Sequence, residues 1–308
     1  MTKKVVSGCV LLLLGTFLLT AALLLWFWAP AHAERTPLST SNDTFLTGEA
    51  DKLDVATGTL KHSPVWVLSR TRTDSDKSDD EVIVFVSTTC VNADDGADSH
   101  QCLKGDDPRL ISNSIDVFAG DRHTGMAVND PKYIGTDGIK HEGLVNKFPF
   151  DTKKKNYEYW DGTLGAAATA TYESTVEIDG LKTYKFQLTI PESKIEVADG
   201  VDGTYTLDKQ MWVEPRTGAI VDQQQHEIRK LSDGTKILDL SLGFTDETKA
   251  QGVSDGKANV KTLDLILVWA PIVGLVSGLI CLGAGAFLLL AGRRRETPTA
   301  ERREPAHV

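Results

Sequence analysis

The stretch VVSGCVLLLLGTFLLTAALLLWFW, residues 5–28, contains no charged side chain and follows Lys3 and Lys4. A second apolar stretch, LILVWAPIVGLVSGLICLGAGAFLLLA, spans residues 265–291. An α-helix rises 1.5 Å per residue, so each stretch is long enough to cross roughly 30 Å of hydrocarbon. The sequence therefore predicts two terminal transmembrane helices, with residues 29–261 forming one large domain between them.

The basic residues next to these segments predict their orientation. Lys3 and Lys4 precede the first segment, and Arg293–Arg295 follow the second. Because Lys and Arg near membrane helices favour the cytoplasmic side, we expect residues 1–4 and 292–308 in the cytoplasm. The expected location is the cell membrane, with two passes and an extracytoplasmic domain at residues 29–261.

The first segment also allows a second interpretation. Ala31-His32-Ala33 matches the A-x-A pattern of a signal-peptide cleavage site. The apolar run is longer than the usual signal core of about 7–15 residues, which favours an uncleaved anchor. Cleavage remains the alternative.

The second segment carries a line of small residues. Gly274 and Gly278 form a G-x-x-x-G pair, and Ser277, Cys281 and Gly285 continue an adjoining line. Small residues let another helix approach closely, so this face predicts packing against the first anchor or self-association. The alternative is that glycine is simply frequent in membrane helices.

Charge and cysteine usage restrict the class of the domain. The chain has a formal charge of −10, and its basic ends make the domain between them more acidic still. This charge argues against a nucleic-acid partner. Cys90 and Cys102 are the two cysteines outside the apolar segments, so we predict a disulfide between them. Acidic residues surround this loop, but their spacing does not match a calcium-binding loop.

The domain is rich in β-strand patterns. Two patterned pairs are joined by turn signals: Asp179-Gly180 links residues 171–178 to 182–190, and residues 215–218 link 205–214 to 219–230. Residues 65–72 and 82–89 form another predicted hairpin, with a polar tip. The expected fold is therefore mainly β, an antiparallel β-meander between two terminal helices. Inside it, the sequence predicts two short helices at most, at Asn42–Asp51 and Pro108–Asn113.

One turn pattern occurs twice. Asp121-Arg-His-Thr-Gly125 and Glu214-Pro-Arg-Thr-Gly218 each combine an acid, two residues, Thr-Gly and an apolar strand start. This repetition predicts two similar hairpins or an ancient duplication; the alternative is a coincidence of turn chemistry.

The domain lacks most of the known catalytic signatures. The sequence has no H-E-x-x-H, P-loop or dinucleotide motif, and its seven histidines are scattered. A glycosidase-like pair of carboxylates is neither located nor excluded by so acidic a sequence. We expect a protein that is not an enzyme, with no catalytic residues, metal or cofactor.

Aromatic residues are concentrated around one basic run. Lys153-Lys154-Lys155 lies between two aromatic groups. The five aromatic residues are Phe148, Phe150, Tyr157, Tyr159 and Trp160. They predict a ligand-binding surface or cavity mouth for a lipid; the alternative is core packing with the lysines on an exposed turn.

Several segments resemble one known family. They are GLVNKFPF (residues 143–150), YEYWD (157–161), GLKTYKF (180–186) and VEPRTG (213–218). In this order, between two anchors, they resemble an actinobacterial membrane-protein family known as porin PorA-like and as a domain of unknown function. The resemblance covers essentially the whole chain and implies a cell-envelope protein without catalytic residues. In layout alone, the chain also resembles the class B scavenger receptors, whose β-rich domain has a lipid tunnel.

These observations lead to an ordered set of expectations. The first is an envelope protein whose domain binds or conveys a hydrophobic ligand, a lipid. The second is a non-catalytic structural or assembly protein that contacts other envelope proteins. The third is a channel subunit, which would rest on the two helices of each subunit, because the predicted strands carry charges on both faces.

Overall fold

The computed structural model describes residues 3–96, 101–103, 105 and 107–293. Two compact units are present: residues 1–33 with 261–308, and Glu34–Val260. Residues 294–308 of the predicted cytoplasmic tail, and part of the acidic loop between Cys90 and Cys102, lie outside the described residues.

The first unit contains the two predicted apolar helices. These are α1 (Lys3–Phe27) and α5 (Ala270–Arg293), with the short α2 (Pro30–Ala33) after α1. One turn of π-helix, η1 (Leu265–Trp269), connects α5 to α4 (Asp246–Asp264). By length and composition, Lys3–Phe27 and the apolar part of Asp246–Ala291 are each candidate membrane spans.

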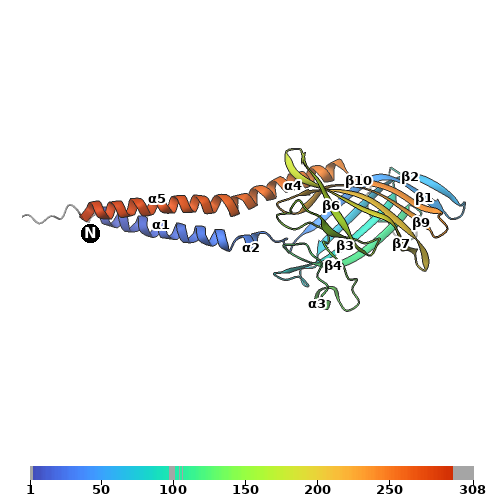
Figure 1. Cartoon of the computed structure of the whole chain (residues 1–308), viewed down its shortest axis with the longest axis horizontal. Coiled ribbons are helices and arrows are strands. Elements are labelled where there is room, and N and C mark those ends of the chain that lie inside the picture. The colour runs from blue at the N-terminus through green and yellow to red at the C-terminus, as the bar shows by residue number, and fades with distance from the viewer. Residues whose placement is uncertain (1–2, 97–100, 104, 106, 294–308) are drawn as a thin grey trace, which may run out of the picture. The chain divides into compact units, whose positions relative to one another are not determined.

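The helices α1 and α5 lie side by side (Figure 1), and small residues spaced seven apart on α1 allow this close approach. The buried residues of α1 are Gly8, Gly15 and Ala22. A Cβ atom on Gly15 would lie 2.8 Å from the carbonyl oxygen of Gly278, and one on Gly285 would lie 2.9 Å from that of Gly8. The contacts run in opposite directions along the two helices, so the pair is antiparallel. The predicted close approach of the first anchor is confirmed.

The second unit is one ten-stranded antiparallel sheet, curved into a half-barrel (Figure 1). Its spatial order is β4-β3-β2-β1-β10-β9-β8-β7-β6-β5, so only the β1–β10 pair joins strands distant in sequence. The strands are β1 (Ser41–Asp54), β2 (Thr59–Thr73), β3 (Val82–Ala93), β4 (Leu110–Asp121), β5 (Tyr157–Asp161), β6 (Ala166–Ile178), β7 (Leu181–Ala198), β8 (Val201–Glu214), β9 (Ala219–Leu231) and β10 (Lys236–Phe244). The predicted antiparallel β-meander is confirmed.

Both short helix predictions were wrong. Asn42–Asp51 lies in β1, and residues 110–113 begin β4. In β1, Leu46 and Ala50 are buried four residues apart, which is also helical spacing. Gly48 lies between them on the same strand face, and a Cβ there would lie 1.8 Å from the Ser241 carbonyl oxygen.

Two helices of the second unit were not predicted. They are α3 (Pro131–Ile134) and the first part of α4. Gly252 and Gly256 of α4 come close to Val221 and Leu181, and Val253 completes this small core. The helix packs through glycines and a valine, so its sequence lacks the wide apolar stripe that predicts a surface helix.

Two short extended segments join the edges of the sheet at one end of the half-barrel. Gly120 of β4 bridges Ala127, Met126 bridges Leu144, and Leu144 bridges Tyr159 of β5. The amide of Trp160 donates to the Leu144 carbonyl at 2.9 Å, and the amide of Ala127 donates to Gly143 at 2.8 Å. We call this the closed end. At the opposite, open end, β4 has no such bridge among the described residues.

Apolar side chains fill the closed end. Phe148 is completely buried and stacks on Phe186, with ring centroids 4.5 Å apart. A second cluster, around Phe85 and Phe118, meets the first where Leu144 and Val145 adjoin. The closed end therefore has a packed core.

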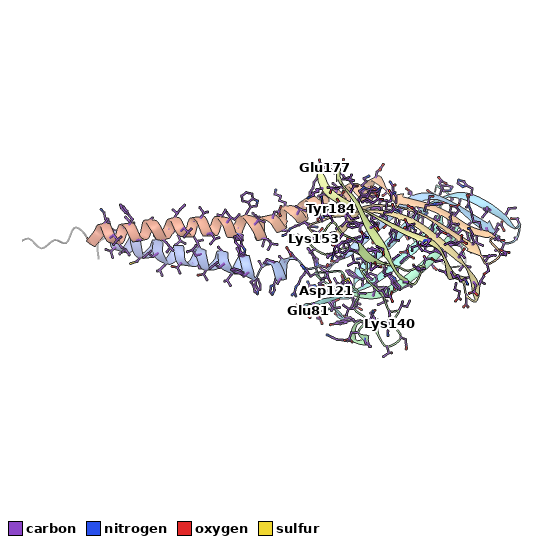
Figure 2. All side chains as sticks on the ribbon, in the orientation of Figure 1. Glu81, Asp121, Lys140, Lys153, Glu177 and Tyr184 are labelled. Carbon is purple, nitrogen blue, oxygen red and sulfur yellow. A yellow bond between two sulfur atoms is a disulfide. The ribbon has the colours of Figure 1, made fainter. Side chains whose placement is uncertain are left out.

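The turn pattern that occurs twice in the sequence, at residues 121–125 and 214–218, has the same geometry at both positions. Asp121 Oδ1 accepts from the Thr124 amide and hydroxyl, and Glu214 Oε2 accepts from the Thr217 amide and hydroxyl. Figure 2 labels Asp121 in the first of these turns. Two further turns, Asp54–Gly58 and Asp161–Gly165, share the acid-to-amide bonds and a final glycine with positive φ. The predicted similarity is confirmed, and it extends to four turns.

These turns hold the chain that closes the barrel. The Val145 amide donates to the Gly125 carbonyl at 3.0 Å, and the Phe148 amide donates to the Gly218 carbonyl at 2.9 Å. The predicted Asp179-Gly180 turn is also confirmed, with φ of 48° and 79°. The segment that contains Val145 and Phe148 is thus held by hydrogen bonds to these two turns rather than by regular pairing with a strand.

Candidate ligand cavity in the half-barrel

A cavity of about 680 Å³ lies inside the half-barrel, on the open side of the packed core. Its walls come from strands on both sides of the β1–β10 pair, and from the segments around residues 139–141 and 160–163. This volume lies within the usual range of small-molecule sites.

One wall of the cavity is apolar. It is formed by neighbouring strands β3, β2, β1 and β10, whose inward side chains share one hydrophobic cluster. The members that face the cavity are Leu46, Val67, Val91, Leu240 and Leu242. This wall suits a hydrocarbon group.

The adjoining wall is polar and charged. It is formed by β8 and β9, where inward positions alternate with exposed ones. Its polar members are Lys209, Gln223, Gln225, Glu227 and Arg229. The ladder pairs Lys209 with Gln225 and Tyr205 with Arg229, so these side chains form one continuous patch.

The acids of the polar wall already have hydrogen-bond donors. Asp161 Oδ1 accepts from the Leu164 amide at 2.8 Å, and its Oδ2 accepts from the Tyr205 hydroxyl at 3.3 Å. Glu227 Oε1 accepts from Arg229 Nη2 at 2.9 Å. Lys209 differs: among the described residues it makes no hydrogen bond or ion pair within 4 Å.

Burial changes the titration of this wall. It lowers the pKa of the Lys209 amine, against the opposing influence of Asp161 and Glu227. It also raises the pKa of Glu227, against the opposing influence of Arg229. Both shifts oppose a charge on these groups, and an anion placed beside Lys209 would counteract its shift and favour the ammonium form.

His141 and Trp160 lie at the inner side of the cavity. His141 is 2% exposed; its Nε2 lies 3.0 Å from Asp116 Oδ2, and its Nδ1 lies 3.0 Å from the Ile139 carbonyl. Both ring nitrogens therefore lie within hydrogen-bond distance of an oxygen. The Trp160 ring lies 4.6 Å from the His141 ring.

The mouth of the cavity exposes apolar side chains. Ile115 of β4 is 74% exposed and Ile139 is 62% exposed, and both line the cavity. They lie next to polar residues of β4, Ser112–Ser114. An apolar group can therefore leave or enter the cavity along a partly apolar rim.

The five aromatic residues singled out from the sequence occupy two environments. Trp160 lines the cavity. Phe148 and Tyr159 belong to the closed-end core, and Tyr157 packs against it. Phe150 is 9% exposed and stacks on His123. The structure therefore places one of the five at the cavity and the other four in packing positions.

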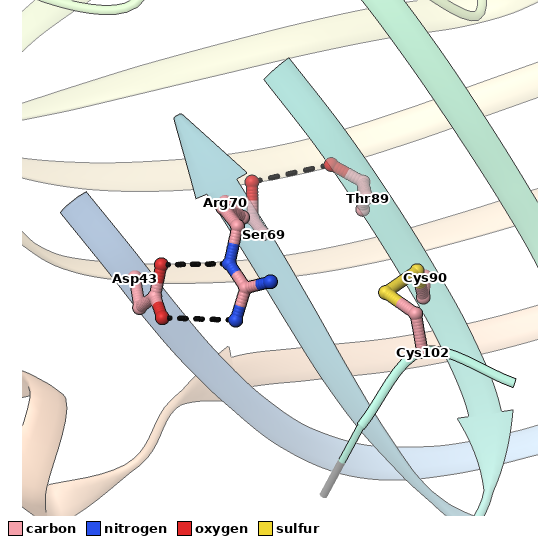
Figure 3. The surroundings of a disulfide bond; sticks show 6 residues. All are labelled: Asp43, Ser69, Arg70, Thr89, Cys90 and Cys102. Carbon is pink, nitrogen blue, oxygen red and sulfur yellow. Dashed lines mark hydrogen bonds and ion pairs between the residues drawn. A yellow bond between two sulfur atoms is a disulfide. The ribbon is translucent and has the colours of Figure 1, made fainter. Parts of the chain in front are cut away.

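The predicted disulfide between Cys90 and Cys102 is present, with Cα atoms 5.5 Å apart (Figure 3). Its neighbour Thr89 faces the cavity and bonds Ser69 of β2, with the oxygens 3.1 Å apart. On the other side of β2, Arg70 forms a two-point ion pair with Asp43 of β1. The disulfide fastens the loop after β3 to the open end of the sheet.

The polar wall was not predicted, although a signal was present. Residues 222–227, DQQQHE, are six consecutive polar residues inside a strand. A strand that is polar on both faces does not pack against an apolar core on either. Lys209 gave a second signal, because it interrupts the buried inward row of Tyr205, Leu207, Met211 and Val213.

Two apolar helices, and a β half-barrel with a mixed polar and apolar lumen, define a membrane protein with a β-rich domain. A family model described as Porin PorA matches residues 7–287, so the chain belongs to the Porin PorA family. A Porin PorA of Corynebacterium resistens is 21% identical to the chain over 283 residues, covering 61% of this chain and 68% of that protein.

Proposed function

We propose that the half-barrel binds an amphiphilic molecule, such as a membrane lipid, in its cavity. The observation that supports this role is the division of the cavity into two walls. Leu240 and Leu242 belong to the apolar wall, while Lys209 and Arg229 belong to the polar one. A purely hydrophobic ligand would leave the charged wall without partners, whereas an amphiphile matches both walls. The role is one of binding rather than catalysis.

A matched pair of substitutions tests this function. Gln225 faces the cavity, whereas its neighbour Gln224 is exposed on the other strand face. Gln225→Trp fills the cavity and should reduce co-purified lipid, measured by mass spectrometry of the full-length protein, by at least about tenfold. Gln224→Trp should leave the lipid content unchanged. Lipid-free wild type, or equal lipid in both variants, would remove the proposal.

A channel-like role is a second candidate, favoured by the family membership. The described part of α1 from Val5 onward has no charged residue, and Thr16 and Thr20 donate to carbonyls of their own helix. A conducting path through the membrane would therefore need several copies. Conductance measurements on the purified full-length protein in planar bilayers test this role, and stepwise currents that Gln225→Trp leaves unchanged would favour it over amphiphile binding.

We also propose that both termini face the cytoplasm, because Lys3, Lys4 and Arg293–Arg295 flank the apolar helices. A phosphatase that is active only outside the cytoplasm, fused after Val308, should be inactive. The same enzyme inserted at the exposed Gly58 turn should be active. An active fusion at Val308 would contradict the two-pass arrangement.

A further inference from the structure

We infer that the polar wall recognises an anionic head group, a carboxylate or a phosphate, through Lys209 and Arg229. This inference rests on the proposed amphiphile-binding function and specifies the chemistry of the ligand's polar end. It starts from the hydrogen-bonding groups of the wall that lack partners.

The groups without partners on this wall are donors. Among the described residues, Arg229 Nε is buried without an acceptor, although Arg229 Nη2 bonds Glu227. The Lys209 ammonium has neither a hydrogen bond nor an ion pair, and its side chain lines the cavity. A buried donor without an acceptor, such as Arg229 Nε, is costly, and Lys209 is a half-buried amine beside it on the same wall, so a ligand that supplies acceptor oxygens is favoured here.

The nearby acids do not supply those acceptors. Asp161 is held by two backbone amides and by the Tyr205 hydroxyl, and Glu227 is held by Arg229. Lys209 is close enough to Asp161 and Glu227 to feel their charge, but it lies beyond ion-pair distance from both. An added carboxylate or phosphate would complete the pairing of Lys209 and give Arg229 Nε an acceptor.

The other orphaned groups indicate a different chemistry. Asp116 Oδ1 is a buried acceptor and Trp160 Nε1 is a buried donor, each without a partner among the described residues. His141 contacts both of these side chains. One acceptor beside one donor suits a neutral hydroxyl rather than an anion, because a hydroxyl both donates and accepts. The anion therefore belongs on the Lys209 side.

The register also places the two cations near the apolar wall. Leu207 pairs with Glu227, and Glu227 pairs with Leu240 of β10 on its other side. The cationic patch and the apolar wall are thus adjacent strands of one sheet. A single ligand with a short distance between its anion and its alkyl chain can contact both.

A competition experiment with matched C12 compounds tests the inference. Full-length protein in amphipol is loaded with the neutral fluorescent probe Nile red, and four competitors are titrated: laurate, dodecyl phosphate, dodecanol and dodecyltrimethylammonium. We expect laurate and dodecyl phosphate to displace the probe at concentrations at least about tenfold below dodecanol, with the cation weakest. The two anions distinguish a carboxylate from a phosphate preference.

Substitutions identify the residues responsible. Lys209→Gln and Lys209→Met should remove the preference for anions over dodecanol, while Lys209→Arg should retain it. Lys194→Gln is the matched control, because Lys194 lies on the exposed face of β7. Two variants of different polarity guard against a folding defect, since each removes the half-buried amine. Circular dichroism confirms that the sheet is intact.

The outcomes separate the two proposals. If anions and dodecanol compete equally, or if Lys209→Gln keeps the preference, the head-group inference is wrong while amphiphile binding stands. If no competitor displaces the probe, or if Gln225→Trp does not weaken displacement, the proposed function itself is wrong. A preference that Lys194→Gln also removes would show a general charge effect and would overturn the assignment to Lys209.

Discussion

The closed and open ends of the half-barrel are made from the same strands but differ in what fills them. At the closed end, Phe148 and Phe186 stack in a core without exposed surface. At the open end, inward positions of β8 and β9 hold the polar side chains Lys209 and Glu227 instead of aromatic rings. Hydrophobic burial stabilises the first end, whereas the second end gives up part of that stabilisation to keep a polar cavity.

The closed end should be the more sensitive to backbone changes. Gly218 has a φ of 75°, and a Cβ there would lie 2.0 Å from the buried Phe148 carbonyl oxygen. Gly218→Val should therefore destabilise the protein by roughly 4 kcal/mol or more, through strain and overpacking. Denaturant unfolding of the full-length protein, followed by near-UV circular dichroism, measures the loss.

Gly180→Val is the matched control for this prediction. Gly180 also has positive φ, but its nearest neighbour is the flexible end of Lys257 at 3.7 Å. We expect a loss of roughly 1–2 kcal/mol from strain alone. Equal losses at the two glycines would show that the contact with Phe148 does not set the stability of the closed end.

Aromatic truncations compare the two ends directly. Phe148→Ala removes a fully buried ring and should cost roughly 3–5 kcal/mol. Trp160→Ala opens into an existing cavity, so its cost should be smaller, roughly 1–3 kcal/mol, and it should reduce co-purified lipid. A larger loss for Trp160→Ala than for Phe148→Ala would reverse this assignment of core and site.

The disulfide should stabilise the open end by a moderate amount. Cys90 and Cys102 are 12 residues apart, and closing a loop of this size is worth roughly 2–3 kcal/mol by the loop-entropy model. The double change to Ala should lower the free energy of unfolding by this amount. Labelling the unreduced, denatured protein should modify Cys9 and Cys281 alone, and modification at Cys90 or Cys102 would contradict the bond.

A pH dependence is also expected at the closed end. Burial lowers the pKa of Lys147 to about 7, against the opposing influence of Glu214 and Asp121. Its amine lies 3.7 Å from the centre of the Phe150 ring and 3.3 Å from Thr36 Oγ1. Between pH 7 and the ordinary lysine value of about 10.4, the unfolded chain binds more protons than the folded one.

The free energy of unfolding should therefore rise with pH across this window. Above it, the destabilising effect of Lys147 should disappear, because the unfolded chain has then lost the same proton. Lys147→Met removes the titrating group, so the difference in unfolding free energy between wild type and variant should shrink as the pH increases from 7 to 10. A difference that is constant with pH would show that Lys147 titrates normally.

Local sequence patterns predicted much of the fold because they act over a few residues. The Asp179-Gly180 pair needs two consecutive positive φ values, which few other pairs tolerate. The acid-x-x-Thr-Gly pattern satisfies its own amides, so it forms the same turn at Asp121 and at Glu214. The helix prediction at residues 42–51 failed because Gly48 has no side chain to show that β1 was alternating.

The sequence by itself determined the two apolar helices, the antiparallel meander, the tight turns and the Cys90–Cys102 bond. Each depends on length, on composition or on contacts between near neighbours. Only the tertiary structure decided that Phe148 is core while Trp160 meets a cavity, and that Lys209 and Arg229 line the same cavity. These assignments depend on how far the sheet curves and where its edges join, and both follow from contacts between residues distant in sequence, such as Leu144 with Tyr159.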